Sequence, residues 1–226
     1  MVFVVPIILV ILSYLAGSIP FGLLIVKLKT GLDIRYIESG RTGGTNAMRA
    51  AGLWVGIFTI ILDSMKTASM VFVARWLAPG NIWMEVISPV IAVIGHNYSI
   101  FLLEPKTSGG FRLRGGAGGA ATVGGALGLW PFSIIIILPI TLLIWFGIGY
   151  ASLATMSSAI LSIILFSILS KLGICPWQYI LYGVFTLLIV LWALRPNIRR
   201  LLNGTERLIG WRARCNKNQR THITTK

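Results

Sequence analysis

The sequence predicts an all-α fold, that of a polytopic membrane protein with about seven transmembrane helices in one bundle. Mean hydropathy is +0.84, and only 12% of the residues are charged. Several apolar runs approach or exceed the roughly 18 to 20 residues that cross a bilayer. Beside such spans, 226 residues leave no room for a separate soluble domain of ordinary size. We therefore expect one membrane domain over residues 1–210 and a basic cytoplasmic tail over residues 211–226.

Three apolar runs in the first half of the chain predict spans at about residues 2–26, 53–77 and 83–102. A polar loop over residues 27–49 separates the first two spans. Pro79 and Gly80 are typical turn residues, and they lie between the second and the third.

The second half of the chain predicts four more spans. A basic loop over residues 104–114 leads to a short glycine-rich span at about residues 118–129, and a fifth span follows Pro131 as far as Gly149. The last two spans cover about residues 153–169 and 177–194. A re-entrant segment between residues 118 and 149 would change this count, because irregular backbone is tolerated where protein covers it.

The placement of positive charge sets the orientation. Of the 20 Lys and Arg residues, 17 fall within residues 27–49, 106–114 and 195–226, and the predicted crossings put all three segments on one side. The positive-inside rule then places the N-terminus outside and the C-terminus inside, in the cell membrane. The net charge of +14 is thus explained by topology and by contact with anionic membrane lipid, and we expect no nucleic-acid partner.

The first polar loop carries the groups that an anion site needs. Its glycines allow backbone amides to approach an oxyanion, and a helix that begins near Thr45 would add free N–H groups. Its donors and glycines are Ser39, Gly40, Arg41, Thr42, Gly43, Gly44, Thr45, Asn46 and Arg49. The alternative is a solvated loop that carries only the positive-inside charge.

A second polar cluster follows the third span. It contains His96, Asn97, Arg112, Arg114, Gly115, Gly116 and Gly118. Glycines with interleaved arginines suit a phosphate, but the P-loop spacing is absent, and helix packing explains such glycines equally well. His96 serves either in a structural hydrogen bond or in proton transfer. No cluster has metal-ligand spacing, so neither a metal nor a cofactor is expected.

Asp63 and Lys66 stand three residues apart within the second span. On a helix they share one face, and pairing lowers the cost of burying both charges. A structural ion pair is favoured over an ion relay, because the sequence shows no chain of other ionisable residues continuing from the pair.

Several stretches, in four motif regions, resemble the bacterial membrane acyl-phosphate glycerol-3-phosphate acyltransferases (the PlsY family), of which the chain looks like a divergent member. Residues 17–22, residues 39–49 and Gly52 resemble the first motif region of the family, and residues 95–101 with the following glycine loop resemble the second. Residues 149–154 match a junction that bears Ser152, and residues 197–206 resemble the C-terminal motif. The resemblance covers about residues 10 to 210 in order.

The resemblance implies an enzyme that transfers a fatty acyl group from acyl phosphate to glycerol 3-phosphate at the cytoplasmic face, giving lysophosphatidic acid and phosphate. It implies no cofactor, and we expect a monomer. The acyl phosphate or its oxyanion would be held by the first loop, through Ser39, Thr45, Asn46 and Arg49. Glycerol 3-phosphate would be held by Arg112, Arg114, Gly115, Gly116 and Gly118. Ser152, Asn197 and Glu206 would complete the site, with Gly40, Gly43, His96 and Asn97 beside the substrates.

Two departures from the family pattern leave other functions open. The glycine loop of the family has two lysines; here Arg114 takes the first place and Ala117 the second. The family has a histidine three positions before its C-terminal asparagine, where this chain has Leu194. An inactive or altered-acceptor relative is therefore one alternative. A small-solute or lipid transporter is another, although the polar groups cluster on one side of the membrane.

Overall fold

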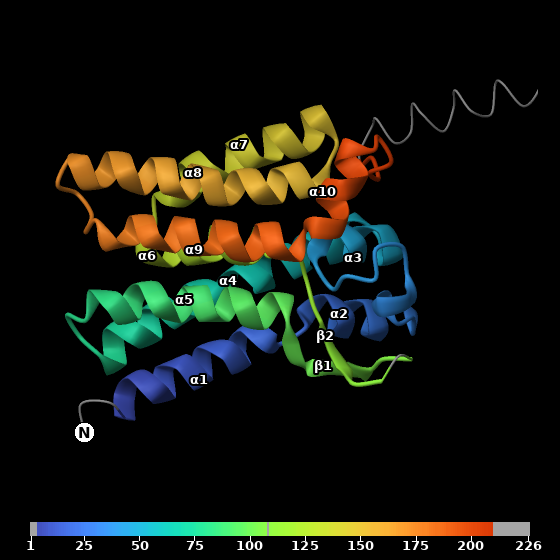
Figure 1. Cartoon of the computed structure of the whole chain (residues 1–226), viewed down its shortest axis with the longest axis horizontal. Coiled ribbons are helices and arrows are strands. Elements are labelled where there is room, and N and C mark those ends of the chain that lie inside the picture. Colours follow the sequence, from blue (N-terminus) through green and yellow to red (C-terminus); the bar gives the residue numbers. More distant parts are fainter. Residues whose placement is uncertain (1–3, 108, 210–226) are drawn as a thin grey trace, which may run out of the picture.

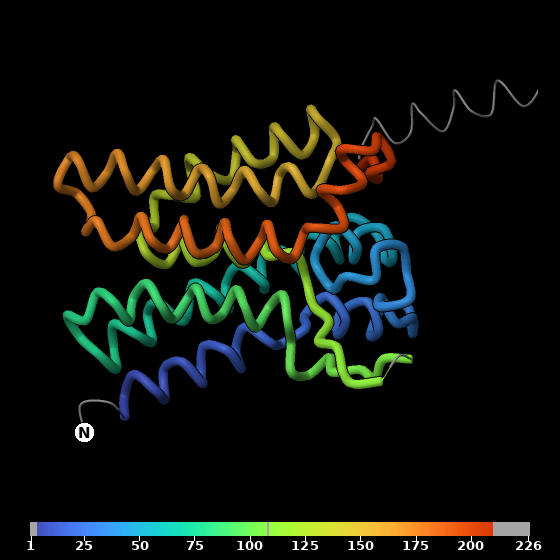
Figure 2. Tube along the Cα trace, in the orientation of Figure 1, coloured from blue at the N-terminus to red at the C-terminus, as the bar shows by residue number. Residues whose placement is uncertain are grey.

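The computed structural model describes residues 4–107 and 109–209, so the expected tail at residues 211–226 lies outside the described residues. Figure 1 shows the elements, and Figure 2 traces the same path as a tube. In chain order they are α1 (Val4–Ser18), α2 (Phe21–Thr30), the 3-10 helix η1 (Ile34–Tyr36), α3 (Gly44–Ala51), α4 (Leu53–Leu77), α5 (Ile82–Asn97), β1 (Ser99–Pro105), β2 (Phe111–Arg114), α6 (Gly119–Leu129), α7 (Ser133–Ile148), α8 (Ala151–Lys171), α9 (Gln178–Ala193) and α10 (Arg195–Leu202).

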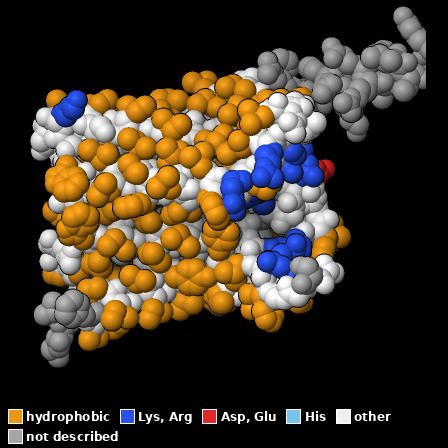
Figure 3. All heavy atoms as spheres, viewed as in Figure 1, with side chains coloured by type: hydrophobic (Ala, Val, Ile, Leu, Met, Phe, Trp, Pro, Cys, Tyr) orange, Lys and Arg blue, Asp and Glu red, His pale blue; other side chains and the backbone are white. Residues whose placement is uncertain are grey.

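The long helices form a bundle along one axis, with the short elements at one end. From α1 through α4, α5, α6, α7 and α8 to α9, the chain runs alternately toward and away from that end (Figures 1 and 2). The end that holds α2, α3, α10 and the two strands is called the polar end. On the face seen in Figure 3, apolar side chains cover most of the bundle, and most of the visible Lys and Arg side chains gather at the polar end. This distribution is typical of a membrane protein.

Three helical segments in the described residues are long and apolar enough to cross a membrane, or up to four if a bent pair counts as one span. They are Val4–Thr30, α4 and α8, and the bent pair is α9 with α10, which meet at 68°. Helices α5, α6 and α7 are apolar but shorter. Apart from α10 and the end of α2, these helices lie where the sequence predicts spans.

The first expected span, at residues 2–26, is broken and extends further. Helix α1 ends at Ser18, and α2 begins at Phe21. Pro20 lies between the two helices and accounts for the break. It has no N–H to donate, and its ring disfavours the helical conformation of the preceding residue. Helix α2 then continues to Thr30, so Lys27 lies on a helix at the polar end and not in a loop.

The third expected span, at residues 83–102, is longer than the helix that forms there. The prediction of an all-α fold also did not include a small two-stranded sheet. Helix α5 ends at Asn97, and residues 99–105 form a strand that pairs antiparallel with β2. The register places Leu103 opposite Leu113 and Glu104 opposite Arg112. Residues 99–103 extend an apolar run, and a short apolar run has the same hydropathy in a helix as in a strand. The expected basic loop at residues 104–114 is therefore part of a hairpin.

Small residues let the helices of the bundle pack closely. A side chain at Gly17 on α1 would overlap the backbone of Ala92 on α5, and one at Gly124 on α6 would overlap the backbone of Ser64 on α4. Phe166 and Tyr182 fill the core where α8 and α9 meet α6, and neither side chain is exposed to solvent. The helices that carry polar groups toward the polar end are thus held rigidly against one another.

Candidate active site

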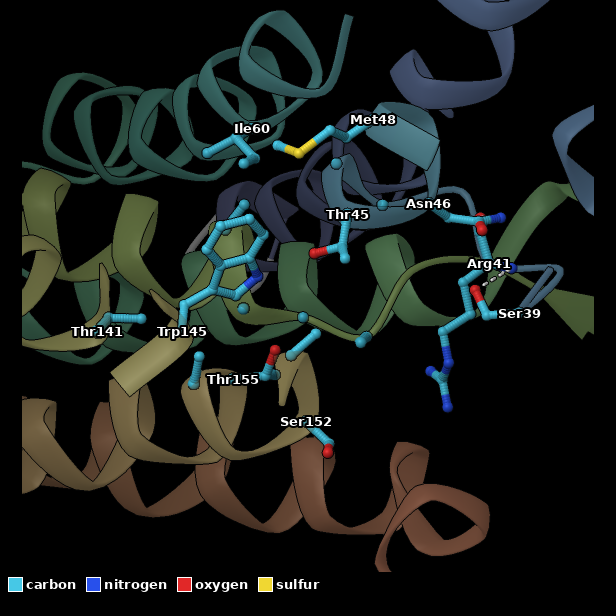
Figure 4. A pocket seen from close by; sticks show the side chains of 18 of the residues that line it. Ser39, Arg41, Thr45, Asn46, Met48, Ile60, Thr141, Trp145, Ser152 and Thr155 are labelled. Carbon is cyan, nitrogen blue, oxygen red and sulfur yellow. Dashed lines mark hydrogen bonds between the residues drawn. The ribbon is translucent and has the colours of Figure 1, made fainter. Parts of the chain in front are cut away.

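A cavity of about 410 Å³, called the first cavity, opens among α3, α4, α6, α7, α8 and α10 near the polar end. Figure 4 shows Thr45, Asn46, Ser39 and Arg41 on one side of it and Ser152 and Thr155 on the other. Ten of the residues predicted from the sequence line it. They are Ser39, Gly43, Thr45, Asn46, Arg49, His96, Gly118, Ser152, Asn197 and Glu206.

The other part of the first cavity is apolar. Its walls are formed by α4 and α7 and include Ile57, Ile60, Leu142, Trp145 and Phe146. Phe146 is 53% exposed and Leu142 is 41% exposed, so this part of the cavity reaches the lipid-facing side of the bundle. A single cavity thus combines basic and hydroxyl-bearing groups at one end with an apolar arm.

A second cavity, of about 580 Å³, lies beside the first at the polar end. It is lined by the remaining predicted residues, which are Gly40, Asn97, Arg112, Arg114, Gly115 and Gly116. Arg35, Tyr36 and Tyr98 also line it. Ser39 and Arg41 line both cavities and so mark their junction. Among the residues predicted for the two polar clusters and the C-terminal part of the site, only Thr42 lines neither cavity.

Asn46 holds the first loop in shape. Its Nδ2 lies 3.3 Å from the carbonyl oxygen of Ile34, 3.0 Å from that of Ile37 and 2.8 Å from that of Arg41. Helix α3 begins at Gly44, as expected for a helix near Thr45. Because the side-chain amide N–H groups are taken up by the backbone, Asn46 positions Thr45 and Arg41, and its donors are not directed at the cavity.

A hydrogen-bonded chain joins the first loop to α10. Nη2 of Arg41 donates to Oδ1 of Asn197 at 3.1 Å, and Nδ2 of Asn197 donates to Oε1 of Glu206 at 2.9 Å. Nε of Arg200 then donates to Oε2 of Glu206 at 3.2 Å. Two residues predicted for the C-terminal part of the site therefore meet the first loop through Arg41.

The arginines of the second cavity share one carboxylate. Glu104 on β1 pairs with Arg35 at 3.0 Å, with Arg112 at 3.1 Å and with Arg114 at 2.6 Å. Arg35 also pairs with Asp33, so two carboxylates face these three guanidinium groups. The remaining positive charge favours an anion in the cavity. The hairpin and η1 are held together by the same contacts.

The glycines of the second loop make room for His96 and Asn97. A side chain at Gly116 would overlap the imidazole of His96, and one at Gly115 would overlap the backbone of both residues. Gly118 has φ +95°, a left-handed conformation that favours glycine, and lies against the side chain of Asn97. Close packing, which the sequence left as an alternative to phosphate binding, thus accounts for these glycines at least in part.

Several buried polar atoms at the cavities have no hydrogen-bond partner within the described residues. They include Oγ of Ser152, Oδ1 of Asn46 and both polar side-chain atoms of Asn97. Buried polar groups are usually paired with protein, water or a bound molecule. Ser152 faces the first cavity and Asn97 the second, so both are positioned to contact a ligand.

Sequence reasoning missed four features of the site. Arg41 was recognised as a donor but not as the residue at the junction of the cavities, because its partners are far away in the chain. Trp145 was read only as part of an apolar span. Asp63 lines the first cavity. His96 continues the Asp63–Lys66 pair, contrary to the expectation that no ionisable residue does so, since His96 Nδ1 lies 3.5 Å from Asp63 Oδ1.

The fold and the cavities define a helical membrane protein that can accommodate a molecule with an anionic head and an apolar chain. The model of the family described as "Glycerol-3-phosphate acyltransferase" matches residues 7–204. The glycerol-3-phosphate acyltransferase of Geotalea daltonii is 38% identical over 203 residues, which are 88% of this chain and 95% of the relative. That of Halalkalibacterium halodurans is 33% identical over 205 residues, which are 89% of this chain and 94% of the relative.

Two solved structures are similar to this chain over most of its length. The crystal structure of PlsY (YgiH), an integral membrane glycerol 3-phosphate acyltransferase in its glycerol 3-phosphate form, superposes with a TM-score of 0.72 at 31% identity. It is matched over 90% of this chain and 95% of that chain. The lysophosphatidic acid form gives a TM-score of 0.70 at 30% identity. The chain belongs to the glycerol-3-phosphate acyltransferase family.

Proposed function

We infer that the protein is an acyltransferase of phospholipid synthesis, which transfers a fatty acyl group from acyl phosphate to glycerol 3-phosphate. The products are lysophosphatidic acid and phosphate. The observation that carries this inference is the first cavity, which has a basic, hydroxyl-bearing end and an apolar arm open to the lipid-facing side. An acyl phosphate has the same two parts, an anionic head and an apolar chain.

The head of the acyl phosphate is placed at Ser39, Thr45 and Arg49. Arg49 supports this role because its only hydrogen bond within the described residues goes to the carbonyl oxygen of Leu208, at 3.2 Å. Within that part of the chain it has no ion pair with a carboxylate, so its charge is available to an anion. Burial lowers the pKa of Arg49, but an arginine stays protonated at neutral pH. Asn46 contributes by holding the loop.

Glycerol 3-phosphate is placed in the second cavity, with its phosphate toward Arg112, Arg114 and the backbone of Gly115 and Gly116. The carboxylates of Glu104 and Asp33 neutralise only part of the positive charge of Arg35, Arg112 and Arg114, which supports binding of a soluble dianion. Because the two cavities meet at Ser39 and Arg41, the acceptor hydroxyl can approach the acyl group at that junction.

In the reaction, the sn-1 hydroxyl oxygen forms a bond to the acyl carbonyl carbon, and the bond between that carbon and the phosphate oxygen breaks. The hydroxyl proton passes to substrate phosphate, and inorganic phosphate leaves. Acyl phosphate is already activated, so orienting the two substrates and stabilising the developing oxyanion supply much of the acceleration. Ser152, across the cavity from Thr45 (Figure 4), and Asn197, which accepts a hydrogen bond from Arg41, complete this environment.

The topology proposed for this function has seven crossings, with the N-terminus outside and the C-terminus inside. The alternating direction of the helices and the basic polar end support it (Figures 1 and 3). The active site then faces the cytoplasm, where glycerol 3-phosphate is available. The protein acts as a monomer, because one chain supplies both cavities.

The test is an assay of the purified protein in lipid or detergent with acyl phosphate and glycerol 3-phosphate. We expect lysophosphatidic acid and an equal amount of phosphate, and phosphate release only when the acceptor is present. Arg49→Ala should lower turnover at least about a hundredfold, since it removes a charge-assisted contact to the reacting group. Lys171→Ala, at the opposite end of α8, is the matched control. Normal turnover by folded Arg49→Ala would remove Arg49 from the site.

A further inference from the structure

Arg41 lies where three distant parts of the chain meet. Its Nη1 donates to the carbonyl oxygen of Gly116 at 3.0 Å. Its Nη2 donates to the carbonyl oxygen of Ala193 at 2.7 Å and to Oδ1 of Asn197 at 3.1 Å. The guanidinium is therefore fixed between the glycine loop and the junction of α9 with α10, and it lines both cavities.

Two of these contacts fall beside the positions where the chain departs from the family pattern. Gly116 precedes Ala117, where the pattern has a lysine, and Ala193 precedes Leu194, where it has a histidine. Ala117 and Leu194 both line the first cavity, as Arg41 does. A cation from the first loop thus stands next to both places from which a basic side chain is missing.

The charge of Arg41 is not neutralised by any carboxylate within 4.0 Å among the residues of the two described ranges. By contrast, Arg35, Arg114 and Arg200 each have such a partner. Burial lowers the pKa of Arg41, which reflects the cost of holding its charge away from water. A partly buried cation without a counter-charge is stabilised when an anion binds beside it.

Arg41 also retains hydrogen-bond donors. A guanidinium has five N–H groups, and the three hydrogen bonds above use one on Nη1 and two on Nη2. Nε–H and the second N–H of Nη1 have no partner recorded within the described part of the chain. These two donors and the unneutralised charge are what a phosphate oxygen needs.

We propose that Arg41 binds the phosphate group of a substrate at the junction of the cavities and replaces the basic side chains that positions 117 and 194 lack. This inference rests on the acyltransferase function proposed above. The phosphate belongs either to the acyl phosphate in the first cavity or to glycerol 3-phosphate in the second. The side chain is held in place by the carbonyl groups of Gly116 and Ala193, so it is oriented before the substrate arrives.

A purely structural role is the competing explanation, because the same hydrogen bonds tie the first loop to α10. Kinetics separate the two. A structural arginine, when removed, lowers the unfolding temperature and the amount of active enzyme without a selective change in KM. A phosphate-binding arginine, when removed, raises the KM of one phosphate substrate in a protein that remains folded.

The first experiment compares the native protein with Arg41→Ala and Arg41→Lys in the lysophosphatidic acid assay, with KM measured separately for each substrate. We expect Arg41→Ala to raise one KM at least about tenfold, the effect of losing one charged hydrogen bond, and Arg41→Lys to recover part of it. The substrate whose KM changes identifies the phosphate. Arg195→Ala, which removes an exposed arginine outside both cavities, is the control and should leave both KM values unchanged.

The second experiment is a rescue. Arg41→Ala combined with Ala117→Lys, or with Leu194→His, restores a basic group beside the same space, and we expect at least one combination to recover most of the lost kcat/KM. Unchanged KM values in folded Arg41→Ala would overturn the proposal. Loss of activity that Arg41→Lys, Ala117→Lys and Leu194→His all fail to restore would assign Arg41 to structure and overturn it as well.

Failure of the proposed function is recognised separately, since the native protein would then form no lysophosphatidic acid. In that case inorganic phosphate serves as the probe. The native protein should show a rise in unfolding temperature with phosphate that Arg41→Ala lacks and Arg195→Ala retains. An equal rise in all three proteins would contradict phosphate binding by Arg41.

Discussion

Asp63 on α4 and His96 on α5 approach each other inside the bundle, with 3.5 Å between Asp63 Oδ1 and His96 Nδ1. The same carboxylate oxygen lies 2.7 Å from Nζ of Lys66. Lys66 also donates to the carbonyl oxygen of Ile19, at the break between α1 and α2. One buried carboxylate, with its partner Lys66, therefore links three helical segments at the wall of the first cavity.

The Asp63 carboxylate should be essential for stability. Asp63→Leu leaves the buried ammonium of Lys66 without a counter-charge, and we expect a loss of about 3 to 5 kcal/mol in the free energy of unfolding. The double variant Asp63→Leu/Lys66→Met removes both charges and should be more stable than Asp63→Leu alone. Unfolding temperatures in one detergent measure both effects. Equal stability of the single and double variants would show that Lys66 finds another partner or reaches water.

Gly116 should tolerate no side chain. Gly116→Ala would place a methyl group on the imidazole of His96, which Asp63 holds in place, and the resulting overpacking costs about 1 to 3 kcal/mol. Activity should fall with stability, because Gly116 also accepts the hydrogen bond from Arg41. Gly147→Ala on α7 is the matched control, since nothing lies within 4 Å of the added carbon. If both variants unfold at the same temperature, the glycine loop is looser than its contacts indicate.

Asn46 should be replaceable by neither a charged nor an apolar residue. Asn46→Asp has the same shape but turns an acceptor toward three carbonyl oxygens, which removes the hydrogen bonds that hold the first loop. We expect a loss of about 1 to 3 kcal/mol and a large drop in kcat, because Thr45 and Arg41 lose their positions. In the control Asn81→Asp, the side chain only accepts a hydrogen bond from the N–H of Met84, which aspartate also does. Thermal unfolding and turnover of the two variants give the comparison.

The sequence predicted the helices well because hydropathy depends on local composition. Their ends were less predictable, since Pro20 breaks the first span and the apolar residues after Asn97 continue as a strand. The polar residues of the cavities could be recognised because glycines, arginines and hydroxyls are unusual between apolar spans. Whether each of them contacts a substrate stays a prediction.

Other features depend on contacts between distant parts of the chain, which one sequence does not reveal. Arg41 meets Gly116 and Asn197 only after the helices have packed. Asp63 and Lys66 lie on one helix, so their pairing could be predicted from helical spacing. His96 lies on another helix, so its contact with Asp63 could not. The sequence also does not distinguish an apolar residue that faces lipid from one that faces a cavity. For this reason the position of Trp145 in the first cavity was not predicted.

Trp145 should limit the length of the acyl chain. Figure 4 shows its indole projecting from α7 into the first cavity, between Ile60 of α4 and Thr155 of α8. Its ring packs edge-on against Phe146, with 4.5 Å between the centroids, so the indole is held by its neighbour. We expect an acyl chain that enters along the apolar arm to meet this ring, which would limit how far the chain extends.

Trp145→Ala lengthens the arm, and each additional methylene buried there is worth about 0.8 kcal/mol. For a chain two carbons longer than the best substrate of the native protein, we expect kcat/KM relative to that substrate to rise about tenfold. Trp76→Ala is the control, because Trp76 is 79% exposed at the far end of α4 and lies on neither cavity. The measurement is a competition between acyl phosphates of different lengths, with the lysophosphatidic acids resolved by mass. An unchanged product distribution in folded Trp145→Ala would mean that the acyl chain follows another path.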